Sequence, residues 1–103
     1  MEEKTDVIEI KKKYVDLTGD LIAGILLSRI AYFLSSENTN KVVEKEGKKW
    51  LAMRRADWKE DCRLSTTQVD RGINLLERKG LIEKKTFKYN GTPIMHVRLL
   101  KEV

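Results

Sequence analysis

Residues 55–85 read RADWKEDCRLSTTQVDRGINLLERKGLIEKK and contain two helix-length segments separated by a short turn. The first segment, Arg55 to Cys62, predicts a short helix with Trp58 and Cys62, four positions apart, on its inward side. The second segment predicts a longer helix over 66–79. We expect this helix–turn–helix to be the centre of the fold.

The longer predicted helix has a start signal and a stop signal. Ser65-Thr66-Thr67-Gln68 matches the capping box, in which the Ser hydroxyl accepts the backbone N–H three residues on and the Gln side chain accepts that of Ser. Gly80 stands just past the helix, where a residue without Cβ adopts the left-handed conformation that closes the last turn. Leu81 can supply the hydrophobic contact that accompanies this cap.

The two sides of this helix differ in character. At a spacing of 3.6 residues, the inward side holds Val69, Gly72, Ile73 and Leu76. The outward side holds Thr67, Arg71, Asn74 and Arg78. Asp70 and Glu77 fall on a flank, so the outward stripe is polar and basic without an acid.

Residues 81–89 and 92–100 flank Asn90-Gly91, the favoured pair for a two-residue type I′ turn, because both positions need positive φ. The sequence therefore predicts a β-hairpin. Pro93 lacks an N–H and belongs on an edge or at a strand start. The hairpin carries several basic and aromatic side chains: Lys84, Lys85, Lys88, Tyr89, His96 and Arg98.

Upstream, residues 18–36 predict one further helix. Thr18 and Asp20 offer capping oxygens ahead of LIAGILLSRIAYFL, which is apolar around much of its circumference. We expect this helix to be buried on more than one side. The remaining upstream segments predict a short strand or extended arm over 7–15, an exposed loop over 37–49 and an isolated strand over 50–53.

The composition indicates one small globular domain. The chain has 103 residues, of which 41% are hydrophobic and 36% charged, against an average charged share of roughly 25%. We expect an N-terminal arm or strand over 1–17 and a single domain over 18–103. The apolar stretch 21–34 contains Arg29 and is shorter than the roughly 20 residues of a membrane span, so we expect a cytoplasmic protein without a membrane segment.

The net charge of +5 is unevenly distributed. Residues 1–20 hold 4 basic and 6 acidic side chains, whereas residues 41–103 hold 16 and 9. A basic domain attracts polyanions, although many lysine-rich proteins bind none. Charge alone does not separate these two cases.

The stretch 55–85 resembles the helix-turn-helix and first wing strand of the winged helix-turn-helix superfamily. LIAGILLSRIAYFL followed by a Trp-containing strand also resembles the winged-helix domains of phage and plasmid replication initiators or replisome organisers. The resemblance covers about residues 18–100 and implies an α+β, mainly helical fold of three helices and a C-terminal hairpin wing. Lys59 and Arg63 depart from the pattern, which commonly has a small residue and Gly there. We therefore expect a less tight turn between the helices.

In that fold the helix over 66–79 enters the major groove, where Arg can bind guanine, and Asn or Gln can bind adenine, through paired hydrogen bonds. The candidate DNA-binding residues on this helix are Thr66, Thr67, Gln68, Arg71, Asn74 and Arg78. The candidate backbone or minor-groove contacts are Arg54, Arg55, Lys84, Lys85, Lys88, Tyr89 and Arg98.

Each group also has a plain structural interpretation. The outward helix stripe can be a solvated face, and the strand lysines can protect a sheet edge from aggregation. One of Arg54 and Arg55 can simply cover Trp50 or Trp58.

Residues with catalytic or metal-binding side chains are few. One Cys excludes an internal disulfide, and one Cys with one His leaves too few ligands for a structural zinc. We expect Cys62 to be a small buried hydrophobe and His96 to be structural or a phosphate contact. Because no convergent set of nucleophile, base or metal ligands is apparent, we expect neither an enzyme nor a cofactor.

Together these features predict a sequence-specific double-stranded DNA-binding protein that acts as a small transcriptional regulator. The wide apolar surface of the helix over 18–36 predicts a homodimer through this helix, with a monomer as the alternative. Such a dimer would place two recognition helices roughly 34 Å apart. Two other functions stay open: the DNA-binding module of a phage or plasmid replication initiator, and a winged helix used for protein–protein contact.

Overall fold

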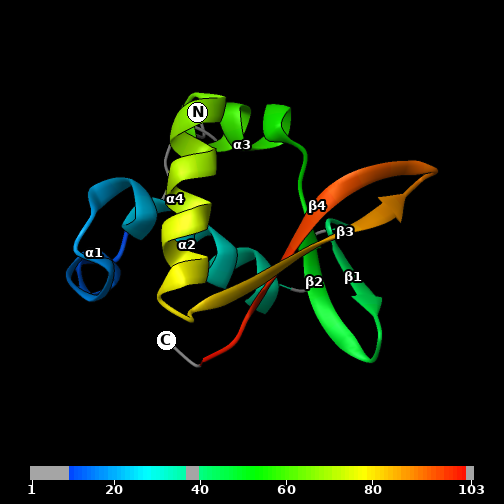
Figure 1. The fold of residues 1–103 in the computed structure, drawn as a ribbon, viewed down its shortest axis with the longest axis horizontal. Coiled ribbons are helices and arrows are strands. Elements are labelled where there is room, and N and C mark those ends of the chain that lie inside the picture. The colour runs from blue at the N-terminus through cyan, green and yellow to red at the C-terminus, as the bar shows by residue number, and fades with distance from the viewer. Residues whose placement is uncertain (1–9, 37–39, 102–103) are drawn as a thin grey trace, which may run out of the picture.

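A computed structural model describes residues 10–36 and 40–101, which form four helices and one four-stranded antiparallel sheet (Figure 1). The elements are α1 (Lys12–Thr18), α2 (Leu21–Ser35), β1 (Val42–Lys45), β2 (Lys48–Ala52), α3 (Arg55–Cys62), α4 (Thr66–Arg78), β3 (Ile82–Tyr89) and β4 (Thr92–Leu99). The predicted α+β class is confirmed. The predicted count of three helices is wrong, because α1 adds a fourth.

Helix α1 forms where a strand or extended arm is predicted. Residues 12–15 belong to this helix, and residues 7–9 lie outside the described residues. Tyr14 and Thr18 are both buried and stand one helical turn apart, so a helix places both on the side that packs against α2. A Cβ at Gly24 would lie 2.8 Å from the Cα of Val15, and the lack of one lets α1 pack directly on α2.

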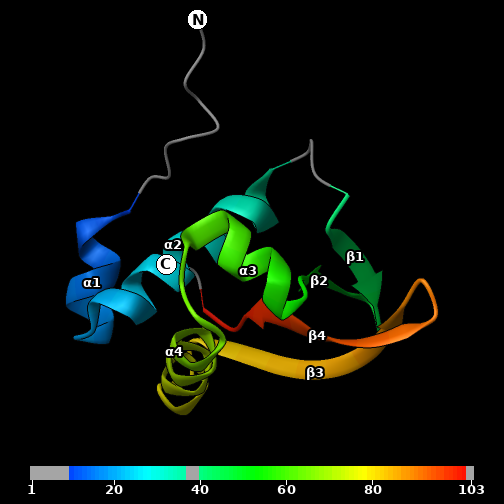
Figure 2. The same cartoon turned by 90° about the horizontal axis from the view of Figure 1, so that it is seen from above.

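Helix α2 is confirmed as a helix that is buried on more than one side. Asp20 caps it by accepting the backbone N–H of Ala23 through Oδ2 at 2.9 Å. Helices α1 and α4 and the sheet all pack against α2 (Figure 2). Among its described residues, the large hydrophobics that remain exposed are Leu21 and Tyr32. The fold itself therefore covers α2, and the apolar surface of this helix alone does not require a second chain.

The sheet has the order β1-β2-β4-β3. Strands β1 and β2 form a hairpin where an exposed loop is predicted over 37–49; residues 37–39 lie outside the described residues. The turn residues Glu46 and Gly47 have φ of 57° and 74°, as in a type I′ turn. The hairpin is missed because residues 44–49 are all charged apart from Gly47, and none of residues 42–49 is buried, which resembles a loop in sequence. The strand predicted as isolated is β2, which pairs with both β1 and β4.

The C-terminal hairpin is confirmed. Asn90 and Gly91 have φ of 53° and 83° and join Tyr89 to its partner Thr92. Pro93 is exposed near the start of β4. Figures 1 and 2 show the tips of both hairpins at the end of the molecule opposite α1.

Helices α3 and α4 are joined by Arg63, Leu64 and Ser65. Helix α3 has the predicted bounds. Arg63 has φ of 61° and ψ of 29°, and its N–H donates to the carbonyl of Lys59 at 2.8 Å. The expectation that Arg63 would avoid positive φ and loosen the turn is wrong, because this residue closes the last turn of α3 in the left-handed conformation.

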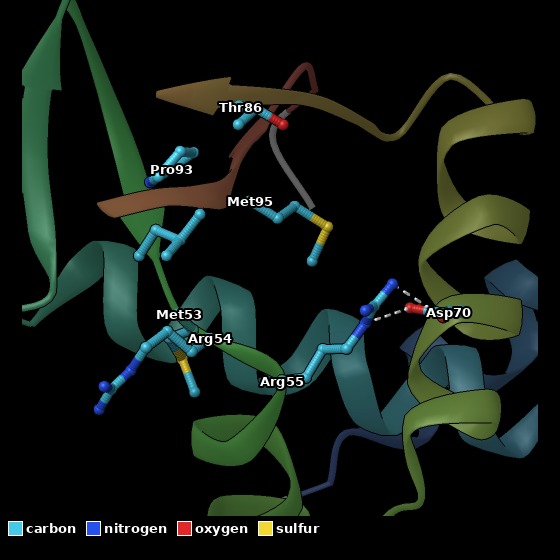
Figure 3. Close-up of a pocket in the computed structure, with 8 residues that line it drawn as sticks. Met53, Arg54, Arg55, Asp70, Thr86, Pro93 and Met95 are labelled. Atoms are coloured by element: carbon cyan, nitrogen blue, oxygen red, sulfur yellow. Dashed lines mark hydrogen bonds and ion pairs between the residues drawn. The ribbon is translucent and has the colours of Figure 1, made fainter. Parts of the chain in front are cut away.

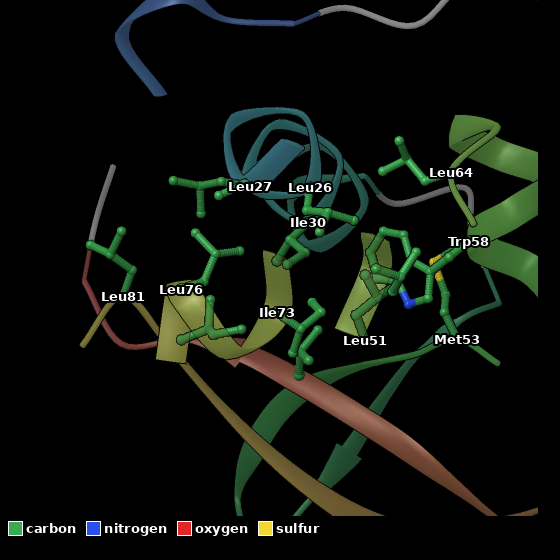
Figure 4. Packing of buried hydrophobic residues seen from close by; sticks show 14 of the residues in the cluster. Leu26, Leu27, Ile30, Leu51, Met53, Trp58, Leu64, Ile73, Leu76 and Leu81 are labelled. Atoms are coloured by element: carbon green, nitrogen blue, oxygen red, sulfur yellow. The ribbon is translucent and has the colours of Figure 1, made fainter. Parts of the chain in front are cut away.

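The core lies between α2, α4, α3 and the inner face of the sheet. Figure 4 shows Leu26 and Ile30 of α2 facing Ile73 of α4, with Leu51 and Trp58 beside them. A Cβ at Gly72 would lie 2.4 Å from Cδ1 of Leu26, so Gly72 lets α4 approach α2 closely. No helix within residues 10–36 and 40–101 has the length and hydropathy to cross a membrane.

Candidate nucleic-acid interface

Helix α4 turns its polar side to solvent. The capping box forms as predicted: the Gln68 N–H donates to Ser65 Oγ at 3.1 Å, and Gln68 Oε1 accepts the Ser65 N–H at 2.9 Å. At the other end, Gly80 has φ of 72° and the Leu81 N–H donates to the Leu76 carbonyl at 3.1 Å. The predicted inward residues are all buried and the predicted outward stripe, Thr67, Arg71, Asn74 and Arg78, is exposed. The predicted orientation of the helix is confirmed.

Three of the candidate residues on α4 already hold partners within the chain. Besides Gln68 in the capping box, Arg71 Nη1 donates to Asp20 Oδ1 at 3.2 Å. Asn74 Oδ1 accepts a hydrogen bond from Lys84 Nζ at 2.6 Å. The other three, Thr66, Thr67 and Arg78, are exposed, and none has a polar side-chain partner among the described residues.

The register of β3 and β4 divides the candidate contacts of this hairpin between two faces. Directly opposed residues of antiparallel strands share a face. Lys84 lies opposite the buried Val97, on the face that packs toward the helices, and Lys88 lies four residues further along the same face. The opposite face carries the other three candidates, Lys85, Tyr89 and Arg98. The structure therefore brings Lys84 to α4, leaves Lys88 further along the same face toward the tip of the hairpin, and places the other three on the opposite face.

Lys85 and Arg98 contact groups of the sheet itself. Lys85 Nζ lies 3.1 Å from Glu46 Oε1, and Arg98 Nε lies 2.7 Å from Glu83 Oε1. Both cations lie over the buried Trp50 ring, 6.0 and 5.5 Å from its centre. The arginine over Trp50 is Arg98, and not Arg54 or Arg55 as the structural alternative predicts. These contacts favour a structural role for both residues.

Tyr89 and His96 also have structural partners on this outer face. The Tyr89 hydroxyl donates to the Asn40 carbonyl at 3.2 Å. His96 is fully buried, with its ring centre 5.1 Å from that of Phe87 and Nδ1 3.0 Å from the Ile94 carbonyl oxygen. A side chain buried to this extent does not reach a phosphate, so the structural interpretation of His96 holds.

A groove of about 420 Å³ lies between α4, the start of α3 and the β3–β4 hairpin (Figure 3). Arg55 reaches across it to Asp70 on α4, with Nη2 3.2 Å from Oδ2. The groove is lined by Met53, Arg54, Arg55, Asp70, Thr86, Pro93, Ile94 and Met95. The side chains of Arg54 and Arg55 are 65% and 66% exposed, so a phosphate can reach both guanidinium groups.

The carboxylates of Asp20 and Asp57, which form ion pairs with arginines of the candidate interface, are ionised at neutral pH. The Ala23 N–H lowers the pKa of Asp20 below its ordinary value of 3.8; burial acts in the opposite direction, and Arg71 lowers it further. Burial raises the pKa of Asp57, but the Arg54 N–H and guanidinium, with the Lys41 ammonium, outweigh it and leave the pKa below 3.8. Both carboxylates therefore compete with phosphate for nearby cations.

Much of the basic charge of the interface is thus paired internally. Within the described part of the chain, Arg78 and Lys88 are the candidate cations that lack an acidic partner. The cations Arg54, Arg55, Arg71 and Lys85 are exposed, whereas Lys84 and Arg98 are partly buried, and exposed ion pairs contribute only about 0–1 kcal/mol each. A phosphate can replace the internal carboxylate at such a site.

Cys62 packs against the core but is only partly buried, where a buried side chain is predicted, and its thiol stays protonated at neutral pH. Burial raises its pKa to about 12, and the neighbouring Asp61 carboxylate acts in the same direction. Among residues 10–36 and 40–101, no group of three His, Cys, Asp or Glu side chains is placed to hold a metal ion.

Sequence reasoning missed the partners that hold the candidate residues in place. The sequence predicts Asp20 only as a helix cap, and no local signal links it to Arg71, which is 51 residues away. The contact of Lys84 with Asn74 spans only ten residues across the Gly80 turn, so the end of the helix and the strand direction could have indicated it.

No protein-family model matches this chain, and no curated protein or solved structure matches it significantly. The candidate interface is therefore supported by its own residues and contacts alone.

Proposed function

We propose that this protein binds double-stranded DNA sequence-specifically, with α4 in the major groove and the β3–β4 hairpin on the backbone or in the minor groove. One observation carries the proposal: the exposed stripe of α4 continues into the Lys84 and Lys88 face of β3. The two parts meet where Lys84 Nζ contacts Asn74 Oδ1 at 2.6 Å. Arginine and amide side chains recognise base edges, and lysines bind phosphates, so one continuous surface holds both kinds of group.

The order and pairing of the elements support a winged helix-turn-helix fold. In this proposal α2, α3 and α4 are its three helices, and the β3–β4 hairpin is the wing. Arg63, Leu64 and Ser65 form the turn between α3 and α4, and β2 supplies a third strand beside β4. Helix α1 and strand β1 are additions to that core.

The candidate contacts divide into two chemical roles. A helix in the major groove contacts bases mainly with its N-terminal residues, which favours Thr67, Gln68 and Arg71 as base contacts. Lys84, which contacts this helix, and Lys88, on the same face of β3, suit phosphates. Arg54 and Arg55 lie at the start of α3, where exposed guanidinium groups suit the same purpose.

For the biological role we propose a small transcriptional regulator that acts by occupying its site. The DNA-binding module of a replication initiator would use the same surface and make the same DNA contacts. A homodimer through α2 stays a prediction, and light scattering after size exclusion tests it: a mass near 12.0 kDa at high concentration contradicts the dimer.

The groove beside α4 favours a second candidate function, contact with another protein. Its lining includes four apolar side chains, Met53, Pro93, Ile94 and Met95. This candidate predicts negligible duplex binding even at about 50 mM salt, where electrostatic attraction to DNA is strong.

Selection from a pool of random duplexes, followed by affinity measurements on the selected site, tests the proposed function. Arg71→Ala should weaken binding to that site by about 1–3 kcal/mol and relax the preference at one base position. Lys88→Ala, the matched loss of a cation outside the helix, should weaken binding to all sequences alike and reduce the salt dependence. Equal losses on selected and random DNA for Arg71→Ala would contradict a base-reading role.

A further inference from the structure

Both carboxamide side chains on the exposed side of α4 have their oxygen atoms engaged within the chain. Gln68 Oε1 accepts the backbone N–H of Ser65 at 2.9 Å. Asn74 Oδ1 accepts a hydrogen bond from the Lys84 ammonium at 2.6 Å. Because both partners are donors, the engaged atom of each carboxamide is its oxygen. The NH₂ group is therefore the end that each side chain offers to a ligand.

The arginines beside Gln68 and Asn74 also leave N–H donors available to a ligand. Arg71 uses Nη1 for Asp20, and its other N–H groups remain as donors. Arg78 is exposed and can only donate. The acids on the flank of the helix are occupied: Asp70 pairs with Arg55, and Glu77 lies 3.8 Å from Lys84. The groups of these amide and guanidinium side chains that hold no partner within the chain are thus N–H donors.

We infer that α4 selects a DNA strand with guanines at the positions that face Gln68, Arg71 and Asn74, an inference that rests on the proposed function. In the major groove guanine offers two acceptors, N7 and O6. Adenine offers one acceptor and one donor, and cytosine offers a donor. The carboxamide and guanidinium donors satisfy both guanine atoms, whereas the adenine and cytosine N–H groups meet, at Gln68, Arg71 and Asn74, no acceptor that is not already hydrogen-bonded.

Lys84 is the positioning residue in this inference. A free Asn side chain recognises adenine by accepting from N6 and donating to N7. The Lys84 ammonium already donates to the oxygen that this pairing needs and would compete there with the adenine amino group, so the NH₂ donor is the fully free end of Asn74. Removal of the ammonium by Lys84→Met should restore the adenine pairing at one position. Lys88→Met is the matched control, because Lys88 lies on the same face of β3 and contacts no amide in the described residues.

Gln68 allows a second variant that preserves the fold. Glutamate serves in the capping box as glutamine does, so Gln68→Glu retains a carbonyl-type oxygen for the Ser65 N–H. The same change replaces the free NH₂ donor by an acceptor oxygen. Gln68→Glu should therefore exchange guanine for cytosine at the position that this residue faces, since a carboxylate accepts from the cytosine amino group.

Selection from random duplexes with wild type and the three variants tests the inference. Wild type should enrich guanines, and methylation of guanine N7 in the selected site should abolish binding. Lys84→Met should change the guanine-to-adenine ratio at one position by about tenfold. Lys88→Met should lower affinity without a change in base preference. Gln68→Glu, with the helix content of wild type by circular dichroism, should enrich cytosine.

The outcomes separate failure of the inference from failure of the proposed function. Absence of any enriched duplex overturns both. An enriched duplex with adenine or cytosine opposite α4, or an unchanged base preference in Lys84→Met, overturns the inference and leaves sequence-specific DNA binding in place.

Discussion

Replacement of Arg63 by glycine should stabilise the protein. The backbone of Arg63 is left-handed, with φ of 61° and ψ of 29°, a conformation that costs an L-residue roughly 1–2 kcal/mol and costs glycine nothing. The side chain is exposed and has no partner in the described residues, so its removal loses little. Glycine also gives the unfolded chain more freedom, which offsets about 0.4–1 kcal/mol. The net gain in the free energy of unfolding is about 0.5–1 kcal/mol.

Urea unfolding followed by tryptophan fluorescence measures this gain, since Trp50 and Trp58 are both fully buried. A gain of this size raises the midpoint by roughly 0.4 M for a small domain. A substitution series sharpens the test: Arg63→Asn should equal or slightly exceed wild type, and Arg63→Val should be less stable, because β-branched residues avoid positive φ. A glycine variant less stable than wild type, or a valine variant equal to it, refutes the reasoning.

Two further substitutions and one chemical reaction test other contacts. Asp20→Asn retains a good helix cap but frees Arg71, so affinity for duplex DNA should rise about two- to fivefold in fluorescence anisotropy. Since the pKa of Asp20 is lowered, its contribution to stability is complete above about pH 4 and is lost as the pH falls through the lowered pKa; Asp20→Asn should show no such loss. Gly24→Ala forces α1 away from α2 and should lower the free energy of unfolding by about 1–3 kcal/mol in thermal unfolding; an increase contradicts the packing. Cys62, partly buried and with a pKa of about 12, should react more slowly with a thiol reagent at pH 7 in the folded than in the unfolded protein, and equally fast reaction of the folded protein contradicts the raised pKa.

Structural features that depend on interactions between residues close in sequence were predictable from the sequence. The capping box of Ser65 and Gln68 and the Asn90-Gly91 turn each depend on backbone geometry over a few residues, and both have the predicted form. Helix α1 depends on tertiary packing, because the buried Tyr14 lies on a helix whose partner is the neighbouring α2. Strand β2 likewise needs β4, which lies more than forty residues on.

In the candidate site, too, some features follow from the local sequence and others depend on tertiary packing. The outward stripe of α4 follows from helical periodicity, and the structure exposes it as predicted. The hairpin cations were predicted as one group, although a period of two already places Lys84 and Lys85 on opposite faces. The ion pair of Arg71 with Asp20 joins two helices whose relative placement only the packed core defines.

An NMR titration of isotope-labelled protein with its selected duplex tests the central claim most directly. At about 50 mM salt, where DNA binding is strong, the amide shifts should change most in residues 66–78 and in β3 between Lys84 and Lys88, and α1 should be unaffected. Shift changes confined to α1 or to the Lys85 and Arg98 face of the sheet, or no change with any duplex, would contradict a DNA interface built on α4.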